Sequence, residues 1–275
     1  MIHLNFKEQK KNLLIFFILS FAISWLLWIP SILVSGGIIA SGPIQILGNF
    51  AIFGPFIAAF SLSYFKAEKG EVKRLFLSGW NFRFEKKWII ALFIPIFISG
   101  FAILTISFIE PMDRFQYAPP LIMWIPNFFL YYFIGGPFTE EYGWRGNALD
   151  RLQSKLNALY SSLILGFIWG IWHLPLFFIS GTVQSYIPIY EFLLIQMLSS
   201  IFYTWILNNN RDKEGNVNVF LAIMYHAMGN FSSMIFPYWV TDLGRWIFFL
   251  INLIVIIAIS IMYGIRTLSK TPKDV

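Results

Sequence analysis

Three short polar clusters interrupt an otherwise apolar chain, and their side chains could do chemistry. The clusters are TEEYGWRGNALD, GFIWGIWHLPLFF and IMYHAMGNF. Their candidate functional side chains are Glu140, Glu141, Arg145, His173, His226 and Asn230. Carboxylate and imidazole groups can transfer protons as general acids or bases, or form a proton or ion relay inside a membrane. The chain has no cysteine, so any catalysis must use oxygen and nitrogen groups.

The usual hydrolase signatures are missing around these clusters. Neither His173 nor His226 belongs to an H-E-x-x-H zinc helix, and no G-x-S-x-G nucleophile turn occurs. The aspartates lie in expected loops or at the ends of apolar runs, so the sequence also predicts no pair of aspartates inside the membrane. The candidate groups that remain are a glutamate, two imidazoles and an amide.

The composition indicates that these groups lie inside a membrane protein. The 275 residues are 57% hydrophobic, 20% aromatic and only 12% charged. A spanning helix needs about 20 mostly apolar residues, so the chain has room for about seven to nine spans and none for a separate soluble domain. We therefore expect one membrane-embedded domain over 1–275, with the motif-bearing core at about 121–236.

Apolar runs bounded by polar or Gly/Pro-rich residues predict eight helices. The expected spans are 13–34, 45–65, 88–109, 121–138, 157–179, 187–208, 217–236 and 245–265. The first run is not followed by a small-residue cleavage site, which predicts a retained span rather than a signal peptide. The expected fold class is an all-α polytopic membrane bundle.

The distribution of basic residues orients these spans. If the N-terminus is cytoplasmic, 18 of the 20 Lys and Arg residues fall in cytoplasmic segments, and only Arg114 and Arg245 fall outside. Both termini are therefore expected in the cytoplasm. Basic loops that face anionic lipid account for the net charge of +6, so no nucleic-acid partner is needed. The charged but aromatic-containing segment 66–87 is expected to lie on the cytoplasmic leaflet.

Simple helix geometry places the clusters at a similar depth. The midpoint between Glu140 and His173 falls in QSKLN, 153–157, which the basic residues assign to the cytoplasm. Roughly 16 residues of helix would put both side chains about 24 Å from that turn, and His226 would lie about 18 Å beyond the loop NNNRDKEGN. This requires a helix that continues through 140–153, after a break at 135–137.

Each feature also has a structural interpretation. A single buried histidine is often only a packing residue, two carboxylates at a helix end are often a solvated cap, and Glu141 and Arg145 could form a local i,i+4 salt bridge. Three helices that deliver polar groups to one depth are harder to explain in this way, because buried polar groups are costly in a membrane. The combination therefore predicts a functional site.

The ordered motifs resemble a known family. E-E-x-x-x-R, a histidine preceded by aromatic residues, and H-x-x-x-N across eight spans resemble the CAAX protease and bacteriocin-processing (CPBP, or Abi) family of intramembrane proteases. The eukaryotic member of that family cleaves the last three residues from prenylated CAAX proteins. There is one departure: Trp169 stands where the family usually has phenylalanine, with Phe167 two residues earlier.

The resemblance implies a division of labour among the clusters. Glu140 and His173 would activate a water that attacks the scissile carbonyl, while His226 and Asn230 would stabilise the oxyanion. A glutamate shielded from bulk water is a suitable general base, and an amide donor aimed at an oxyanion contributes about 3 kcal/mol in comparable sites. The resemblance thus implies a hydrolytic centre.

Metal dependence is an alternative, because the family has also been regarded as metalloenzymes. Glu140, His173 and His226 would make a zinc set with an open fourth position. We favour a metal-free site that requires no cofactor, because the motifs lack the i,i+4 histidine pair that fixes zinc on one helix.

The expected partners follow from the resemblance. The substrate would be a lipidated or membrane-anchored peptide in membrane lipid, such as a prenylated CAAX-type tail, a peptide pheromone or a bacteriocin leader. Glu141 and Arg145 would support the site, with Arg145 either balancing carboxylate charge or binding a substrate carboxylate. The expected location is the cell membrane, as a multi-pass protein.

Two other functional classes compete with a peptidase. A proton- or ion-coupled transporter could use the same buried groups as a relay, although the sequence shows no related halves. A non-catalytic immunity or scaffold protein could keep the fold of the family without its activity.

Overall fold

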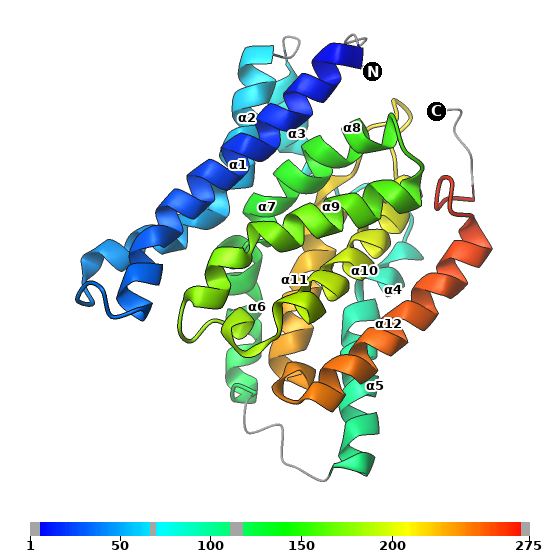
Figure 1. Cartoon of the computed structure of the whole chain (residues 1–275). Coiled ribbons are helices and arrows are strands. Elements are labelled where there is room, and N and C mark those ends of the chain that lie inside the picture. Colours follow the sequence, from blue (N-terminus) through cyan, green and yellow to red (C-terminus); the bar gives the residue numbers. More distant parts are fainter. Residues whose placement is uncertain (1–5, 67–69, 111–117, 271–275) are drawn as a thin grey trace.

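The computed structural model describes residues 6–66, 70–110 and 118–270 and is built from helices, with no strand in these ranges (Figure 1). The first part of the chain contains α1 (Phe6–Ser35), η1 (Pro43–Phe53), α2 (Gly54–Lys66), α3 (Glu71–Ser78), α4 (Trp88–Leu92) and α5 (Ile94–Ile109). The motif-bearing part contains η3 (Leu121–Met123), α6 (Trp124–Phe133), α7 (Pro137–Gly143), η4 (Trp144–Ala148), α8 (Leu149–Gln153) and α9 (Ala158–Trp172). The remainder contains η5 (Leu174–Phe178), η6 (Val183–Tyr186), α10 (Ile189–Asn208), α11 (Val219–Ile235), η7 (Tyr238–Val240) and α12 (Asp242–Tyr263).

The predicted polytopic helical bundle is confirmed. Within the ranges that the structure describes, six helical segments are long and apolar enough to cross a membrane: Glu8–Ser35, Pro43–Phe65, Leu121–Gln153, Ala158–Phe178, Ile189–Asn208 and Asp242–Tyr263. The two other predicted runs correspond to the shorter apolar helices α5 and α11. The run predicted at 88–109 is divided at Phe93, because Pro95 near the start of α5 has no backbone N–H to continue the ladder.

Side-chain caps define where several of the helices begin. Asn157, Asn218 and Thr241 precede α9, α11 and α12, and each side chain accepts a hydrogen bond from the backbone N–H three residues later. Such a cap satisfies one of the donors that the first helical turn leaves free. The polar boundaries used to separate the apolar runs are therefore also helix starts.

The connections alternate between two sides of the bundle, as the basic residues predict. The start of α1 and the ends of α2, α8, α10 and α12 lie at the upper side of Figure 1, and the links from α1 to η1, from α9 to α10 and from α11 to α12 lie at the other side. Arg245, at the start of α12, is on this second side. Arg114, like Lys69 and Lys273, lies outside the described residues.

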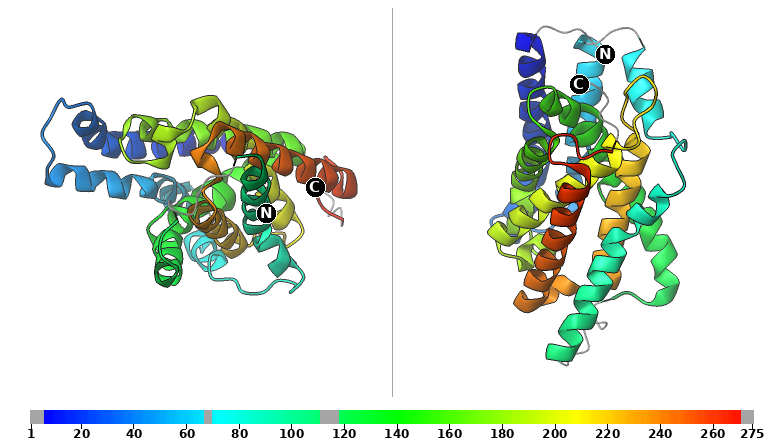
Figure 2. Two further views of the ribbon diagram at one scale, coloured as in Figure 1. Left: turned by 90° about the horizontal axis from the view of Figure 1, so that it is seen from below. Right: turned by 90° about the vertical axis from the view of Figure 1, so that its right-hand side faces the viewer.

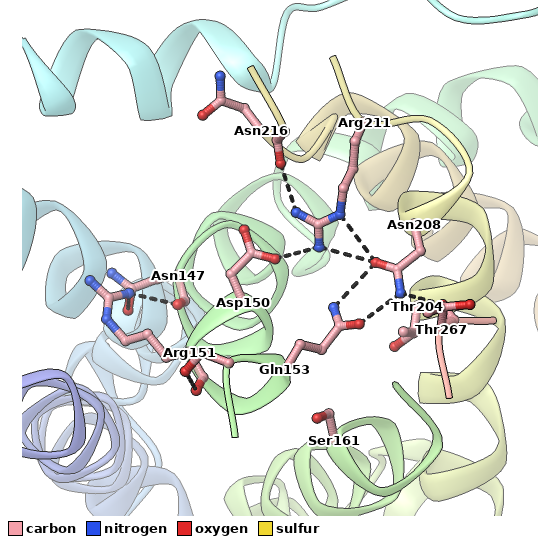
Figure 3. Close-up of polar contacts among 12 residues, drawn as sticks. Asn147, Asp150, Arg151, Gln153, Ser161, Thr204, Asn208, Arg211, Asn216 and Thr267 are labelled. Atoms are coloured by element: carbon pink, nitrogen blue, oxygen red, sulfur yellow. Dashed lines mark hydrogen bonds and ion pairs between the residues drawn. The ribbon is translucent and has the colours of Figure 1, made fainter. Parts of the chain in front are cut away.

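A polar network ties the helix ends together at the upper side (Figure 3). Arg211 Nη2 donates to Asp150 Oδ1 at 2.5 Å, which joins the loop after α10 to α8. Gln153 and Asn208 exchange two hydrogen bonds, and Asn208 Nδ2 also donates to the Thr267 carbonyl at 2.8 Å. This network fixes the hairpin of α8 and α9 against α10 and the segment that follows α12.

Close helix packing holds the motif-bearing helices in place. A Cβ at Gly166 would lie 2.7 Å from the backbone of α10, so glycine permits the approach of α9 to α10. The hydroxyls of Ser162 and Thr204 form a 2.6 Å hydrogen bond across the same interface. At the lower end, α5 packs against both α11 and α12 (Figure 2), and the Ser99 hydroxyl donates to that of Ser232 at 3.2 Å.

The segment expected to lie on the membrane surface forms α3 and the turn after it. Leu75 is buried, whereas Phe76, Leu77 and Trp80 are exposed, as an interfacial helix requires. The Tyr142 hydroxyl donates to the Phe76 carbonyl at 3.0 Å, so this segment is attached directly to α7.

Candidate active site

The candidate site begins at a break between helices α6 and α7. Gly136 has a φ of +108°, which glycine adopts readily, and Pro137 then starts α7. A Cβ at Gly136 would collide with the Glu140 carboxylate, so the side chain of Glu140 folds back over the break. The predicted break at 135–137 is confirmed. The helix continues through α7, η4 and α8, which was the condition for Glu140 and His173 to meet.

One turn of π-helix follows Glu141 and was not predicted from the sequence. This turn, η4, carries Arg145, whose side chain is completely buried. Short π-helical turns are frequent at functional sites because they change the direction of one or two side chains within a helix. Here the π-turn joins α7 to α8 while Arg145 faces the interior of the bundle.

Glu140 is held by a residue of α9. Its side chain is only 3% exposed, and the indole Nε1 of Trp169 donates to its Oε2 at 2.7 Å. Trp169 is one helical turn before His173, so Glu140 and His173 are both attached to the last turns of α9.

His173 is anchored to the same tryptophan through the backbone. Its Nδ1 lies 2.8 Å from the Trp169 carbonyl oxygen. Because a carbonyl only accepts hydrogen bonds, this contact needs the proton on Nδ1, and a neutral ring then has its lone pair on Nε2. The ring is wedged edge-to-face against Trp172 at 4.8 Å and Phe192 at 5.3 Å between centroids. His173 is therefore oriented with an acceptor nitrogen available to a reacting group.

Glu141 connects His226 to Arg145. Its Oε1 accepts from His226 Nδ1 at 2.7 Å and from Arg145 Nη1 at 3.0 Å. The guanidinium lies between two rings, with its carbon 4.3 Å from the centroid of Trp169 and 3.8 Å from that of Tyr203. The predicted i,i+4 salt bridge is confirmed, but both partners are fully buried, so it is not a solvated cap.

Asn230 reaches the break from α11. It lies one turn after His226, is half-buried, and its Nδ2 donates to the Gly135 carbonyl at 3.3 Å. Gly135 adjoins Gly136, against which the Glu140 carboxylate rests. The structure thus brings all six predicted side chains into one cluster supplied by α7, η4, α9 and α11.

Two further residues of the site were not recognised from the sequence. The sequence marks Trp169 only as a departure from the usual phenylalanine, and gives no sign that its indole N–H is used as a donor. Tyr203 lies in α10, where no polar motif stands out, and it is one of 12 tyrosines in the chain. Its ring contacts both the guanidinium of Arg145 and, edge-on at 6.2 Å, the ring of His226.

The arrangement was also compared with the requirements of a metal site. Within the described part of the chain, no three His, Cys, Asp or Glu side chains are grouped so that they could hold one ion. Glu140, His173 and His226 are accordingly not grouped as the zinc set considered above. The Nδ1 contacts of the two histidines do not decide the matter, because a histidine that holds a metal through Nε2 also bonds to protein through Nδ1. The metal-free hypothesis stays a prediction.

Comparison with known proteins shows which proteins this cluster is similar to. Residues 122–232 match the family model described as type II CAAX prenyl endopeptidase Rce1-like. The chain is also 28% identical over 239 residues to CAAX prenyl protease 2 of Methanococcus maripaludis, with 81% of this chain and 84% of the relative covered. The matched segment contains the whole cluster, and the resemblance inferred from the motifs is confirmed.

Proposed function

We propose that the chain is an endopeptidase like the Rce1-like CAAX prenyl endopeptidases whose family model matches residues 122–232, and that Glu140 and His173 are its water-activating pair. One observation carries this proposal. The buried carboxylate of Glu140 is fixed by the indole of Trp169, and the carbonyl of the same residue fixes His173. A base and a second acceptor are thus both attached to Trp169, an arrangement that favours attack by a single water between them.

In the proposed reaction, a water placed between Glu140 and Nε2 of His173 gives one proton to the carboxylate. Its oxygen attacks the scissile carbonyl carbon, and the electron pair of the C=O bond moves to the oxygen. The tetrahedral intermediate then collapses, the C–N bond breaks, and the proton held by Glu140 passes to the leaving amine. Water is consumed, and a carboxylic acid and an amine are formed.

His226 and Asn230 would stabilise the oxyanion of this intermediate. The Asn230 amide has two N–H donors, and only one is needed for the carbonyl of Gly135. His226 uses Nδ1 for Glu141, so it can donate from Nε2 only as an imidazolium, whose charge the Glu141 carboxylate offsets. Each donor of this kind contributes about 3–4 kcal/mol to transition-state stabilisation.

The burial of Arg145 favours one of the two roles considered for it. Its side chain is 0% exposed and is enclosed by Glu141 and the rings of Trp169 and Tyr203. A buried guanidinium in this position balances the Glu141 carboxylate, and a substrate carboxylate could reach it only by displacing those rings. We therefore assign Arg145 to charge balance.

The proposed substrate is a peptide anchored in the membrane by a lipid, with a prenylated CAAX-type tail as the first candidate. The relative from Methanococcus maripaludis is named a CAAX prenyl protease, which supports this choice. A site formed by helices of three candidate membrane spans and by the shorter apolar helix α11 suits a substrate that is itself held in lipid. The proposed location is the cell membrane.

Purified protein in detergent, supplied with a prenylated reporter peptide and its unlipidated twin, tests the proposal. We expect Glu140→Ala and His173→Ala to abolish cleavage while thermal unfolding remains cooperative. Glu191→Gln is the matched control, because Glu191 is also buried but pairs with Arg245 outside the cluster. Full activity in either alanine variant would refute the assignment. Glu140-dependent proton or ion uptake by proteoliposomes, without any cleavage, would indicate a transporter instead.

A further inference from the structure

Trp169 contacts four of the charged or titratable groups of the cluster. Its indole N–H donates to Glu140 and its carbonyl accepts from His173. Its ring covers the guanidinium of Arg145 at 4.3 Å and lies edge-on to the ring of His226 at 5.3 Å. The side chain is only 3% exposed. It therefore does more than fill space, and its individual contacts can be separated chemically.

A phenylalanine at this position could reproduce most of these contacts. The carbonyl that fixes His173 belongs to the backbone, and a phenyl ring can cover a guanidinium or meet a histidine edge. Only the hydrogen bond from Nε1 to Glu140 needs the indole. That bond joins α9 directly to the proposed catalytic carboxylate, at 2.7 Å.

The two oxygens of Glu140 have different surroundings. Oε2 accepts the indole N–H, whereas Oε1 lies against Gly136 and takes part in none of the hydrogen bonds found among the described residues. The last torsion angle of a glutamate side chain has a broad distribution, so a carboxylate without a fixed partner samples many orientations. A donor on Oε2 removes that freedom and leaves Oε1 free to accept a proton.

We propose that Trp169 is a positioning residue that selects the basic oxygen of Glu140: it holds Oε2, so that Oε1 takes the proton from the attacking water. This inference rests on the proposed function of Glu140. Trp169 does not touch the water or the scissile bond, so its effect is exerted through the orientation of the carboxylate.

Indole donation to a charged group is not general in this bundle. The Nε1 atoms of Trp88, Trp144, Trp172 and Trp205 are buried without a hydrogen-bond partner among the residues that the structure describes. Trp205 is the matched control, since it is buried in α10 and packs edge-on against Trp88 and Tyr263 rather than in the cluster.

The first test compares Trp169→Phe with Trp205→Phe on the prenylated reporter peptide. Loss of one hydrogen bond to a charged group should lower kcat about 10- to 100-fold in Trp169→Phe, with KM within about twofold of the wild type. Trp205→Phe should change neither constant. A kcat for Trp169→Phe within about twofold of the wild type would overturn the inference, as would a loss expressed only in KM.

A spectroscopic test reports the contact without using activity. In protein labelled with ¹⁵N at the indole nitrogens, the Trp169 resonance is assigned by its disappearance in Trp169→Phe. We expect this resonance to move in Glu140→Gln, while the Trp205 resonance stays. An unmoved Trp169 resonance would overturn the inference. The two proposals fail separately: an active Glu140→Ala variant refutes the catalytic role of Glu140, whereas an inactive Glu140→Ala variant beside a fully active Trp169→Phe variant refutes only the positioning role.

Discussion

Removal of the Glu141 carboxylate should destabilise the protein more than the loss of so small a group suggests. Glu141 and Arg145 are both 0% exposed, and Glu141 provides the one ion pair formed by Arg145 among the described residues. Glu141→Leu would leave the guanidinium with only the faces of Trp169 and Tyr203 as partners. Breaking a buried pair by removing one partner typically costs about 3–5 kcal/mol. We expect a loss of that size in the free energy of unfolding.

A double variant separates the stability of this pair from its role in the site. With Arg145→Met added to Glu141→Leu, the unpaired guanidinium is removed as well, and an apolar pair of similar volume is often as stable as the original. The double variant should therefore recover to within about 1–2 kcal/mol of the wild type. Its activity should not recover, because His226 Nδ1 has lost its acceptor. Loss of such an orienting partner lowers rates by about 100-fold or more.

Unfolding by titration with SDS in mixed micelles, followed by tryptophan fluorescence, measures the free energies. Hydrolysis of the prenylated reporter measures the activity of the same samples. The reasoning would be refuted if Glu141→Leu cost less than about 1 kcal/mol, or if the double variant were as unstable as the sum of the two single variants. Wild-type kcat in the double variant would show that His226 needs no acceptor.

Three further predictions concern the break, the amide and the cofactor. Gly136→Ala should lower the free energy of unfolding by about 1–3 kcal/mol and reduce activity, because φ is +108° and the new Cβ would collide with the Glu140 carboxylate. Gly229→Ala is the control. It has open space around its Cβ and should be near neutral in the same unfolding and cleavage assays. Asn230→Ala should lower kcat about 10²- to 10³-fold, because it removes an oxyanion donor. The free energy of unfolding should change little, because the side chain is only half-buried. An unchanged kcat would exclude Asn230 as an oxyanion donor. The wild type should keep its rate in the presence of a strong chelator, and a complete loss that zinc reverses would contradict the metal-free hypothesis.

Much of the fold could be predicted because it depends on local sequence. Runs of apolar residues, polar helix caps at Asn157 and Asn218, and a Gly-Gly-Pro break are local signals, and all of them correspond to features of the structure. The similar depth of Glu140, His173 and His226 could also be predicted from the sequence, because the length of a helix is set by its number of residues.

The arrangement of the neighbouring glutamates could not be predicted in the same way. Glu140 and Glu141 are adjacent, and a small rotation of α7 decides which of them faces α9 and which faces α11. The π-helical turn at η4 directly follows α7, and its Arg145 packs between Trp169 of α9 and Tyr203 of α10. Such choices are made by tertiary contacts, which leave no periodic signal in the sequence.

The most direct test of the central claim is the single-turnover rate of peptide cleavage in Glu140→Gln, measured with enzyme in excess over the prenylated reporter. The variant keeps the size of the side chain and an acceptor for the indole of Trp169, but it removes the base. The account predicts a rate lower by about 10²- to 10⁴-fold, with unchanged affinity for the peptide and a wild-type rate in Glu191→Gln. A rate for Glu140→Gln close to that of the wild type would show that Glu140 does not activate the water.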